Sequence, residues 1–433
     1  MVGKQTAAQP DRFSRNDIHR MSAVIRRLLG PPLDDGYAER VWTRRELNGA
    51  LVTAVDPVDA EEVARELLMR YPTPPPLPGI ADAVRRVVAV LTAPVIREPV
   101  GPPRFGLPEI GDVGALASWL NVSVDELDWF ADHGLWLQRA TPRLRHYRVT
   151  RIPKRHSGFR VIEAPKERLA TLQRRILDAI LADVPAHPAA HGFVRGRSPY
   201  SFAAPHSLHD TVIRVDLKHC FEHITAAQVR AVFTAVGYRS ATARCLAEIC
   251  TTATAFDDLP GDDPFHAGLL RGRHVPQGAP TSPALVNLAL RRLDFRIAGY
   301  AAKNGLAYTR YGDDLALSGD EMNVGQLLWV VRNVIVDEGF TLHPEKVRVM
   351  GDHQRQQLAG LVVNVGPRSR RSDFDELKAL LHNATCTGAR AQNRGAHADF
   401  RAHVYGRIGW VATGSAARRR KLLALAAEVD WDG

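Results

Sequence analysis

Two adjacent carboxylates in the segment RYGDDLALSG (310–319) are the clearest chemical signal in this sequence. Asp313 and Asp314 follow Gly312 between two short apolar stretches, which predicts a β-hairpin over 306–319 with the acids at its turn. Like charges at such short range repel each other, and partial burial raises the cost. A divalent cation removes that cost, because hard oxygen ligands suit Mg²⁺. The alternative is an ordinary turn that contains Asp.

A third carboxylate, Asp216, makes the metal site the better interpretation. It closes the predicted buried strand VIRV (212–215), so its side chain is expected to emerge at the edge of a sheet. If that strand lies beside the hairpin, the three acids can share two metal ions about 3.5–4 Å apart. The predicted metal ligands are therefore Asp216, Asp313 and Asp314.

The elements that must position these acids are helices and strands that interleave without a regular βαβ period. This pattern favours an α+β fold over a Rossmann-type sheet. Two strands joined by a turn are expected within 145–165, and two short helices within 111–132 around a turn at 121–123. Apolar periodicity predicts further helical segments at 17–30, 58–70, 80–91, 166–184, 226–252, 282–302, 323–339, 373–383 and 418–429, with 282–302 as one long helix.

Charge is distributed unevenly along the 433 residues, whose formal net charge is +10. Residues 141–175 carry a net charge of +9 and residues 366–433 carry +5, whereas the remaining segments are near neutral. Two separate basic blocks indicate a polyanion held between two walls. A hydrophobic fraction of 45% is that of an ordinary globular protein, and the length suggests two or three domains.

Targeting and cysteine patterns point to the cytoplasm. No window of the sequence is apolar enough to span a membrane, and the N-terminus has no apolar core of a secretory signal. The four cysteines include no CxxC pair, so we expect reduced thiols and neither a disulfide framework nor a zinc site.

From about residue 147 to residue 364 the sequence resembles reverse transcriptases, with the motifs in the right order. The matching segments are YRVTRIPKRHSGFRVIEAPKERLATLQRRI, AAHGFVRGRS, VDLKHCFEHI, HVPQGAPTSPALVNLAL, YGDD, EGFTLHPEKVRVM and LAGLVVN. The resemblance implies an RNA-directed DNA polymerase that adds dNTPs to a primer 3′-hydroxyl with two Mg²⁺ ions. It also implies a right-hand fold, with a helical N-terminal extension (1–110), fingers and palm (111–365) and a basic helical thumb (366–433).

Phe221 is the candidate for sugar discrimination. It follows Asp216 by five residues, and a large apolar ring there offers no polar partner to a ribose 2′-hydroxyl. In the family the matching aromatic residue is a steric gate. The alternative is that Phe221 is a core residue.

Further binding residues follow from the same resemblance. Lys154 and Arg160 flank the fingers turn, where cations could clamp the incoming triphosphate. Gln277 and Gly278 lie in a turn before a helix and would let the backbone approach the nascent base pair. Lys346 is placed like the family lysine proposed to protonate pyrophosphate.

Within the family, stretches such as SPYSFAAPHSL and YTRYGDDLALSGD are similar to retron enzymes. This similarity implies a structured non-coding RNA as template and primer source, an RNA–DNA hybrid, a role in antiphage defence and an effector protein as partner. Three signatures differ from the retron pattern. The retron signature Asn-Ala-x-x-His is reduced to His191, because His187 and Pro188 stand in its first two positions. The signature Val-Thr-Gly is replaced by Leu358-Ala359-Gly360. The usual Tyr-Ala-Asp-Asp is replaced by Tyr-Gly-Asp-Asp. Gly312 only removes a methyl group, so catalysis is expected to be retained.

Three alternatives remain at this point. One is a bacterial defence-type reverse transcriptase outside the retrons. Another is an RNA-templated RNA polymerase, because a Gly-Asp-Asp turn also marks those enzymes; the segment Gln-Gly-Ala-Pro-Thr-Ser-Pro and Phe221 disfavour it. The last is a non-catalytic RNA-binding protein that keeps a polymerase shell, which the presence of all three acids disfavours.

Overall fold

The computed structural model describes residues 13–30, 42–75, 77–91, 102–153, 159–261 and 263–431. The chain divides into two compact units. The first comprises residues 1–185, 219–289 and 337–341, and the second comprises residues 186–218, 290–336 and 342–433. Both units combine helices with strands, so the predicted α+β class is confirmed.

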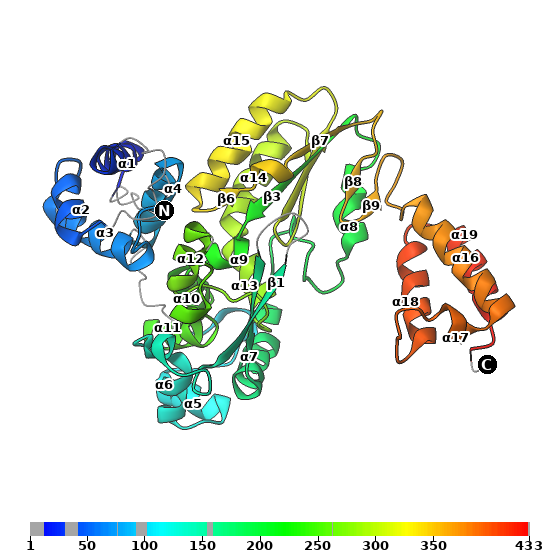
Figure 1. The fold of residues 1–433 in the computed structure, drawn as a ribbon, viewed down its shortest axis with the longest axis horizontal. Helices are drawn as coiled ribbons and strands as arrows, with labels where there is room; N and C mark the ends of the chain where they lie inside the picture. Colours follow the sequence, from blue (N-terminus) through cyan, green and yellow to red (C-terminus); the bar gives the residue numbers. More distant parts are fainter. Residues whose placement is uncertain are drawn as a thin grey trace, which may run out of the picture. The chain divides into compact units, whose positions relative to one another are not determined.

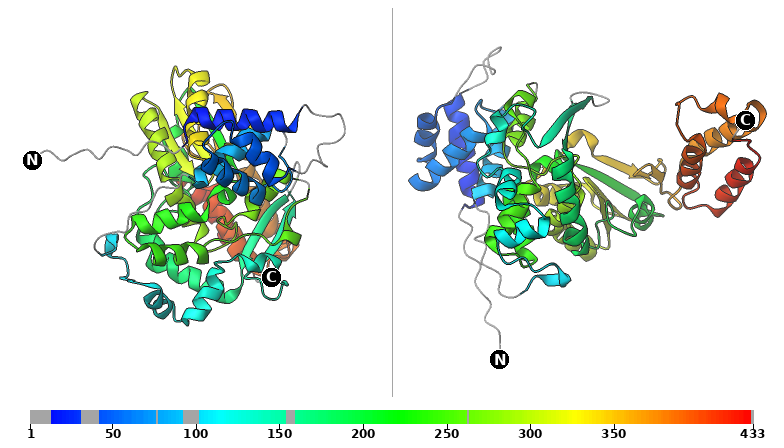
Figure 2. Two further views of the ribbon diagram at one scale, coloured as in Figure 1. Left: turned by 90° about the vertical axis from the view of Figure 1, so that its left-hand side faces the viewer. Right: turned by 90° about the horizontal axis from the view of Figure 1, so that it is seen from below.

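Four helices at the start of the first unit share one core. They are α1 (Arg15–Leu29), α2 (Arg44–Leu51), α3 (Pro57–Arg70) and α4 (Ile80–Leu91). Their buried residues include Met21, Ile25, Leu47, Val63 and Val84, and both views of Figure 2 show the helices, in blue, packed together. The predicted helices at 17–30, 58–70 and 80–91 are confirmed, whereas α2 was not predicted.

The rest of the first unit holds a hairpin and a set of short helices. Strands β1 (Tyr147–Pro153) and β2 (Phe159–Pro165) pair antiparallel, with Tyr147 opposite Pro165. The helices are α5 (Val113–Leu120), α6 (Val124–Ala131), α7 (Glu167–Ala179), α9 (Cys220–His223), α10 (Ala226–Ala235), α11 (Ser240–Ile249), α12 (Pro264–Arg271) and α13 (Ser282–Ala289). The helix pair around 121–123 is as predicted, because Asn121 adopts the left-handed conformation that ends α5.

Two predicted helical stretches are interrupted. The segment 226–252 forms α10 and α11, which are separated at Gly237, where φ is 113°. The prediction of one helix over 282–302 is wrong, since it forms α13 and α14 (Arg291–Lys303). The break falls at Leu290, whose ψ of −1° interrupts the helical hydrogen-bond pattern between the two.

A five-stranded sheet lies in the second unit except for Thr341, the first residue of its strand β6. Its strands are β3 (Thr211–Lys218), β4 (Ala307–Tyr311), β5 (Asp314–Gly319), β6 (Thr341–Leu342) and β7 (Arg348–Gly351). The order is β4-β5-β3-β6, and β7 also pairs with β3. Helices α8 (Pro199–Ala203) and α14 contact β4, and α15 (Val324–Asp337) follows the hairpin β4–β5 in sequence (Figure 1). Every residue of β3 and β5 is buried or partly buried, so these two strands form the enclosed part of the sheet.

The C-terminal part of the second unit is a small hairpin followed by a helical bundle. Strands β8 (Gln357–Leu358) and β9 (Leu361–Val362) precede α16 (Arg371–Thr387), α17 (Ala389–Gln392), α18 (Phe400–Val411) and α19 (Ala416–Ala427). Figure 1 shows these helices, in orange to red, packed on one another. Their core includes Leu377, Leu381, Val404, Ile408 and Leu422. The predicted helices at 373–383 and 418–429 are confirmed, and α17 and α18 are additional.

No helix in the described part of the chain is long and apolar enough to cross a membrane. All four cysteines are free, as the sequence predicts: Cys220, Cys245 and Cys250 are buried, and Cys386 is exposed.

Candidate active site

The three predicted acids meet because of the register between β3 and β5. Asp216 lies directly opposite Asp314 in this antiparallel pair, and the Leu217 amide donates a hydrogen bond to the Asp313 carbonyl at 3.0 Å. Asp313 lies in the two-residue turn that joins β4 to β5, after Gly312 with a φ of 62°. This left-handed conformation favours glycine. The turn therefore presents Asp313 and Asp314 beside Asp216, as the sequence predicts.

The acids are poorly hydrated and repel one another. Asp216 is only 4% exposed, and Asp313 and Asp314 are partly buried. Loss of water raises the pKa of Asp313 to about 6, with the charges of Asp216 and Asp314 as further causes. Burial also raises the pKa of Asp314, although Arg214 opposes this rise. Such a group of carboxylates has the all-oxygen chemistry and the excess negative charge that suit a hard divalent cation.

Two cations balance part of this charge. Lys346, in the turn after β6, donates from Nζ to Asp216 Oδ1 at 2.8 Å. Arg214 holds Asp314 through both of its carboxylate oxygens, with Nη2 at 2.8 Å from each and Nε at 2.9 Å from Oδ1. Three carboxylates against two cations leave one negative charge.

Arg214 is a site residue that the sequence analysis missed, although a signal for it exists. It interrupts the apolar strand VIRV two residues before Asp216. Because side chains in a strand alternate between faces, Arg214 and Asp216 share one face of β3. A charged residue on the same strand face as a predicted metal-binding acid is the pattern that would have found it.

A buried ion pair between Arg310 and Asp294 stabilises the turn at Gly312 and Asp313. Arg310 in β4 donates to both carboxylate oxygens of Asp294 in α14, at 2.8 and 2.7 Å, and both side chains are fully buried. Arg310 Nη1 also donates to the Gly312 carbonyl at 2.9 Å. The Tyr308 hydroxyl donates to Asp294 at 2.7 Å. This network fixes the backbone directly before Asp313.

A second segment packs against the same turn. The amides of Arg310 and His191 form hydrogen bonds of 2.7 Å with the carbonyls of Ala189 and Arg310, respectively. A Cβ atom on Gly192 would lie 2.6 Å from the Gly312 amide nitrogen, so only glycine permits this approach. The motif AAHGF therefore lies along β4 and is joined to it by one parallel bridge between Ala190 and Arg310.

The remaining predicted binding residues belong to the first unit. Phe221 lies half-buried in α9, and Arg160 is exposed in β2. The Gln277 carbonyl accepts a hydrogen bond from the Glu163 amide of β2 at 2.9 Å. Gly278 has a φ of 131°, and a Cβ there would lie 3.1 Å from Ile162 Cγ2. The structure thus brings Gln277 and Gly278 against the strand that carries Arg160, and Lys154 lies outside the described residues.

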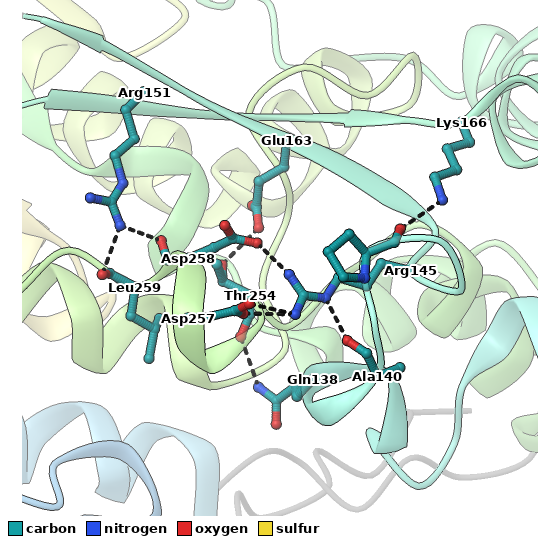
Figure 3. A network of polar contacts seen from close by, with 11 residues as sticks. Gln138, Ala140, Arg145, Arg151, Glu163, Lys166, Thr254, Asp257, Asp258 and Leu259 are labelled. Carbon is teal, nitrogen blue, oxygen red and sulfur yellow. Dashed lines mark hydrogen bonds and ion pairs between the residues drawn. The ribbon is translucent and has the colours of Figure 1, made fainter.

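The base of the β1–β2 hairpin is held by a polar network (Figure 3). Arg145 forms ion pairs with Asp257 and Asp258, and Arg151 donates to the carbonyls of Asp258 and Leu259 at 3.1 and 2.9 Å. Lys166 donates to backbone carbonyls in the segment before β1. Part of the basic block 141–175 is therefore engaged within the protein, whereas Arg143, Arg148 and Arg160 are exposed.

Comparison with known proteins identifies similar sequences. A profile of the family described as reverse transcriptase (RNA-dependent DNA polymerase) matches residues 152–363. Retron Mx65 reverse transcriptase of Myxococcus xanthus is 38% identical over 309 residues, 71% of this chain and 69% of that protein. Retron Mx162 reverse transcriptase of the same organism is 36% identical, over 64% of this chain and 60% of that protein. Retron Ec86 reverse transcriptase of Escherichia coli is 31% identical, over 65% of this chain and 81% of that protein.

Proposed function

Because this chain belongs to the retron-type reverse transcriptases and is an RNA-directed DNA polymerase, we propose that Asp216, Asp313 and Asp314 hold two Mg²⁺ ions at the site of nucleotide addition. The observation that carries this proposal is the β3–β5 register, which sets Asp216 opposite Asp314 and beside Asp313. When bound, the ions supply the positive charge that activates a primer 3′-hydroxyl and neutralises the leaving pyrophosphate.

Family membership confirms the predicted right-hand polymerase fold and favours DNA synthesis over the alternative of RNA synthesis. It also favours the retron group over other bacterial defence enzymes. The division into an extension (1–110), fingers and palm (111–365) and thumb (366–433) remains a prediction. The separate cores of α1–α4 and α16–α19 support it.

The side chains around the acids have distinct proposed roles. Arg214 positions Asp314 through its bidentate hydrogen bonds. Lys346 Nζ lies 2.8 Å from Asp216 Oδ1, on a side chain that is about half exposed, and is proposed to donate a proton to pyrophosphate as it leaves. Arg310 holds the Gly312 carbonyl, and so orients the turn that carries Asp313.

Residues of the first unit are proposed to bind the nucleotide and the nascent base pair. Phe221 excludes the ribose 2′-hydroxyl by its bulk, and Lys154 with Arg160 binds the triphosphate. Gly278 is exposed and lacks a side chain, which supports close approach of the backbone at Gln277 and Gly278 to the base pair.

The partner proposed for this enzyme is a structured non-coding RNA that serves as template and primer source and yields an RNA–DNA hybrid. The relatives are named as retron enzymes, which supports an RNA of this kind. A role in antiphage defence with an effector protein is part of the same proposal. A cytoplasmic location is also proposed, and the four free cysteines support it.

Primer extension on an RNA template with dNTPs tests the site. We expect Asp313→Asn to lower the rate about 1,000-fold, because several kcal/mol of charge stabilisation are lost. Asp352→Asn, which changes an exposed acid in the same unit, is the matched control and is expected to keep full activity. Unchanged activity in Asp313→Asn would disprove the site assignment, and preference for NTPs would disprove the assigned substrate.

A further inference from the structure

A cluster of imidazoles and carboxylates lies in the first unit and contains none of the proposed Mg²⁺ ligands, although His219 follows Asp216 by only three residues. His219 precedes α9, Glu222 lies within it, and His266 lies in the first turn of α12. Ligand atoms from these three side chains all lie within 4.8 Å of one another. Asp263, which caps α12, is a fourth member: its Oδ2 is 3.9 Å from His219 Nε2.

The distances fit coordination better than hydrogen bonding. His266 Nε2 lies 3.4 Å from Glu222 Oε1, which is long for a hydrogen bond between an imidazole and a carboxylate. Two ligands that each lie 2.0–2.1 Å from a tetrahedral zinc ion are separated by about 3.4 Å. The capping geometry adds to this fit, since Asp263 Oδ1 accepts from the His266 amide at 2.9 Å while Oδ2 faces His219.

Charge and burial also favour a cation. The side chains of His219, Glu222 and His266 are only 6%, 6% and 4% exposed. The two imidazole rings stack with centroids 4.0 Å apart, so protonation of both would place like charges face to face in a buried site. Two carboxylates facing these rings are balanced by one divalent ion.

We propose that His219, Glu222 and His266, with Asp263 as the fourth ligand, form a structural site for a divalent first-row transition metal of the zinc class. Imidazole nitrogen selects such metals over Mg²⁺, and two nitrogens with two carboxylates match the four-coordinate preference of zinc. Asp263 is 38% exposed and provides the route of entry. The site joins α9 to α12, shares no ligand with the proposed Mg²⁺ site, and is proposed without reference to the polymerase mechanism.

Metal binding to the full chain tests the proposal directly. Protein stripped with a chelator is kept in excess Mg²⁺, which occupies hard oxygen sites, and is titrated with Co²⁺ while its visible absorption is followed. We expect one equivalent of Co²⁺ to give the strong band of a four-coordinate site, and Zn²⁺ to displace it. His219→Ala and His266→Ala are expected to weaken binding at least about 100-fold.

Two control variants locate the metal. His397 and His403 form another stacked pair, with centroids 3.7 Å apart, in the C-terminal helices. The variant His403→Ala is expected to bind Co²⁺ like the unaltered chain, as is Asp313→Asn. The proposal would be overturned if His403→Ala or Asp313→Asn lost the Co²⁺ absorption band while His219→Ala kept it. It would also be overturned if the unaltered chain bound no Co²⁺.

X-ray absorption of the zinc-loaded, unaltered chain keeps the proposal testable if the histidine variants do not fold. The expected first shell contains nitrogen and oxygen only, with the outer scattering of two imidazoles. Sulfur in that shell would assign the metal to a cysteine such as Cys220 and would overturn the proposal.

Discussion

Two pairs of aspartate and arginine in the second unit look alike in chemistry but differ in burial. Arg310 and Asp294 are both fully buried, whereas Arg214 is 36% exposed and Asp314 19% exposed. The first pair closes on itself, with Tyr308 as a third partner. The second pair is open to solvent and adjoins two further carboxylates. Burial without excess charge indicates a structural role for Asp294, and partial burial with excess charge supports the proposed metal site at the acids around Asp314.

The largest effect is expected at the buried pair. Asp294→Asn leaves the Arg310 guanidinium buried without a balancing charge, which should lower the free energy of unfolding by about 3–5 kcal/mol. Urea denaturation followed by circular dichroism measures this change. Asp352→Asn, at an exposed acid, should leave the midpoint unchanged. A stable Asp294→Asn variant would remove the structural role assigned to this pair.

The same type of substitution in the acid group, Asp313→Asn, should raise the stability of the folded chain at neutral pH and not lower it. The pKa of Asp313 is about 6 in the folded chain against the usual 3.8, so folding retains a proton between these pH values. Stability without metal should therefore fall as pH rises from 4 to 6, by about 2–3 kcal/mol in total. At pH 7, Asp313→Asn should be more stable than the unaltered chain by about this amount, although it is expected to lose nearly all of its activity.

Thermal unfolding in EDTA at pH 4.5 and pH 7 measures this contrast. When Mg²⁺ is added at pH 7, the stability of the unaltered chain should rise to that of Asp313→Asn, because a bound cation stabilises the folded state. If Asp313→Asn is destabilised to the same degree as Asp294→Asn, the distinction between the two regions fails.

Arg214→Gln tests the partly exposed ion pair between Arg214 and Asp314 and is expected to have a smaller effect. Without the guanidinium, which opposes the burial-driven rise, the pKa of Asp314 rises further. Primer extension at pH 7 should slow about 10-fold, which corresponds to about 1.4 kcal/mol, and should recover at higher pH or higher Mg²⁺. Arg214→Lys should recover part of the activity, and Arg355→Gln, at an exposed arginine, should have none of these effects. A loss that no pH or Mg²⁺ concentration reverses would contradict a positioning role.

An effect of similar size, on the choice of nucleotide and not on the rate, is expected outside the acid group at Phe221. Phe221→Ala should raise the incorporation of NTPs relative to dNTPs about 10-fold, since discrimination by an apolar ring is worth only 1–3 kcal/mol. Phe221→Tyr keeps the ring and should keep the discrimination. Steady-state incorporation of both nucleotide types on one template measures the ratio. An unchanged ratio in Phe221→Ala would make Phe221 a core residue.

The local parts of the fold and site were accessible from the sequence because their signals are local. Asp313 lies in a turn whose Gly312 adopts a positive φ, and the adjacent Asp314 begins the strand that follows. Helices such as α4 follow directly from apolar periodicity, and α1 and α3 also begin at capping residues. Where the prediction of one helix over 282–302 was wrong, apolar periodicity continued across Leu290 although the hydrogen-bond pattern did not.

The supporting residues depend on contacts between distant segments, which no spacing reveals. Gly192 is required only because its segment packs against Gly312, 120 positions later in the chain. Likewise, His219 and Glu222 meet His266 only because α9 and α12 pack together. The absence of paired cysteines argued against zinc, but this signal says nothing about histidines that converge from separate helices.

The amino-acid sequence by itself determined the chemistry of this protein: three acids, an ordered set of polymerase motifs and two basic blocks. Only the tertiary structure decided which arginine forms an ion pair with which aspartate, because ion pairing depends on strand register and burial. Arg310 and Arg214 are the same residue type in two strands of one sheet, β4 and β3, on either side of β5. Because Arg310 is fully buried, it is a structural partner of Asp294. Arg214 is partly exposed, and it pairs with Asp314 at the surface of the acid group.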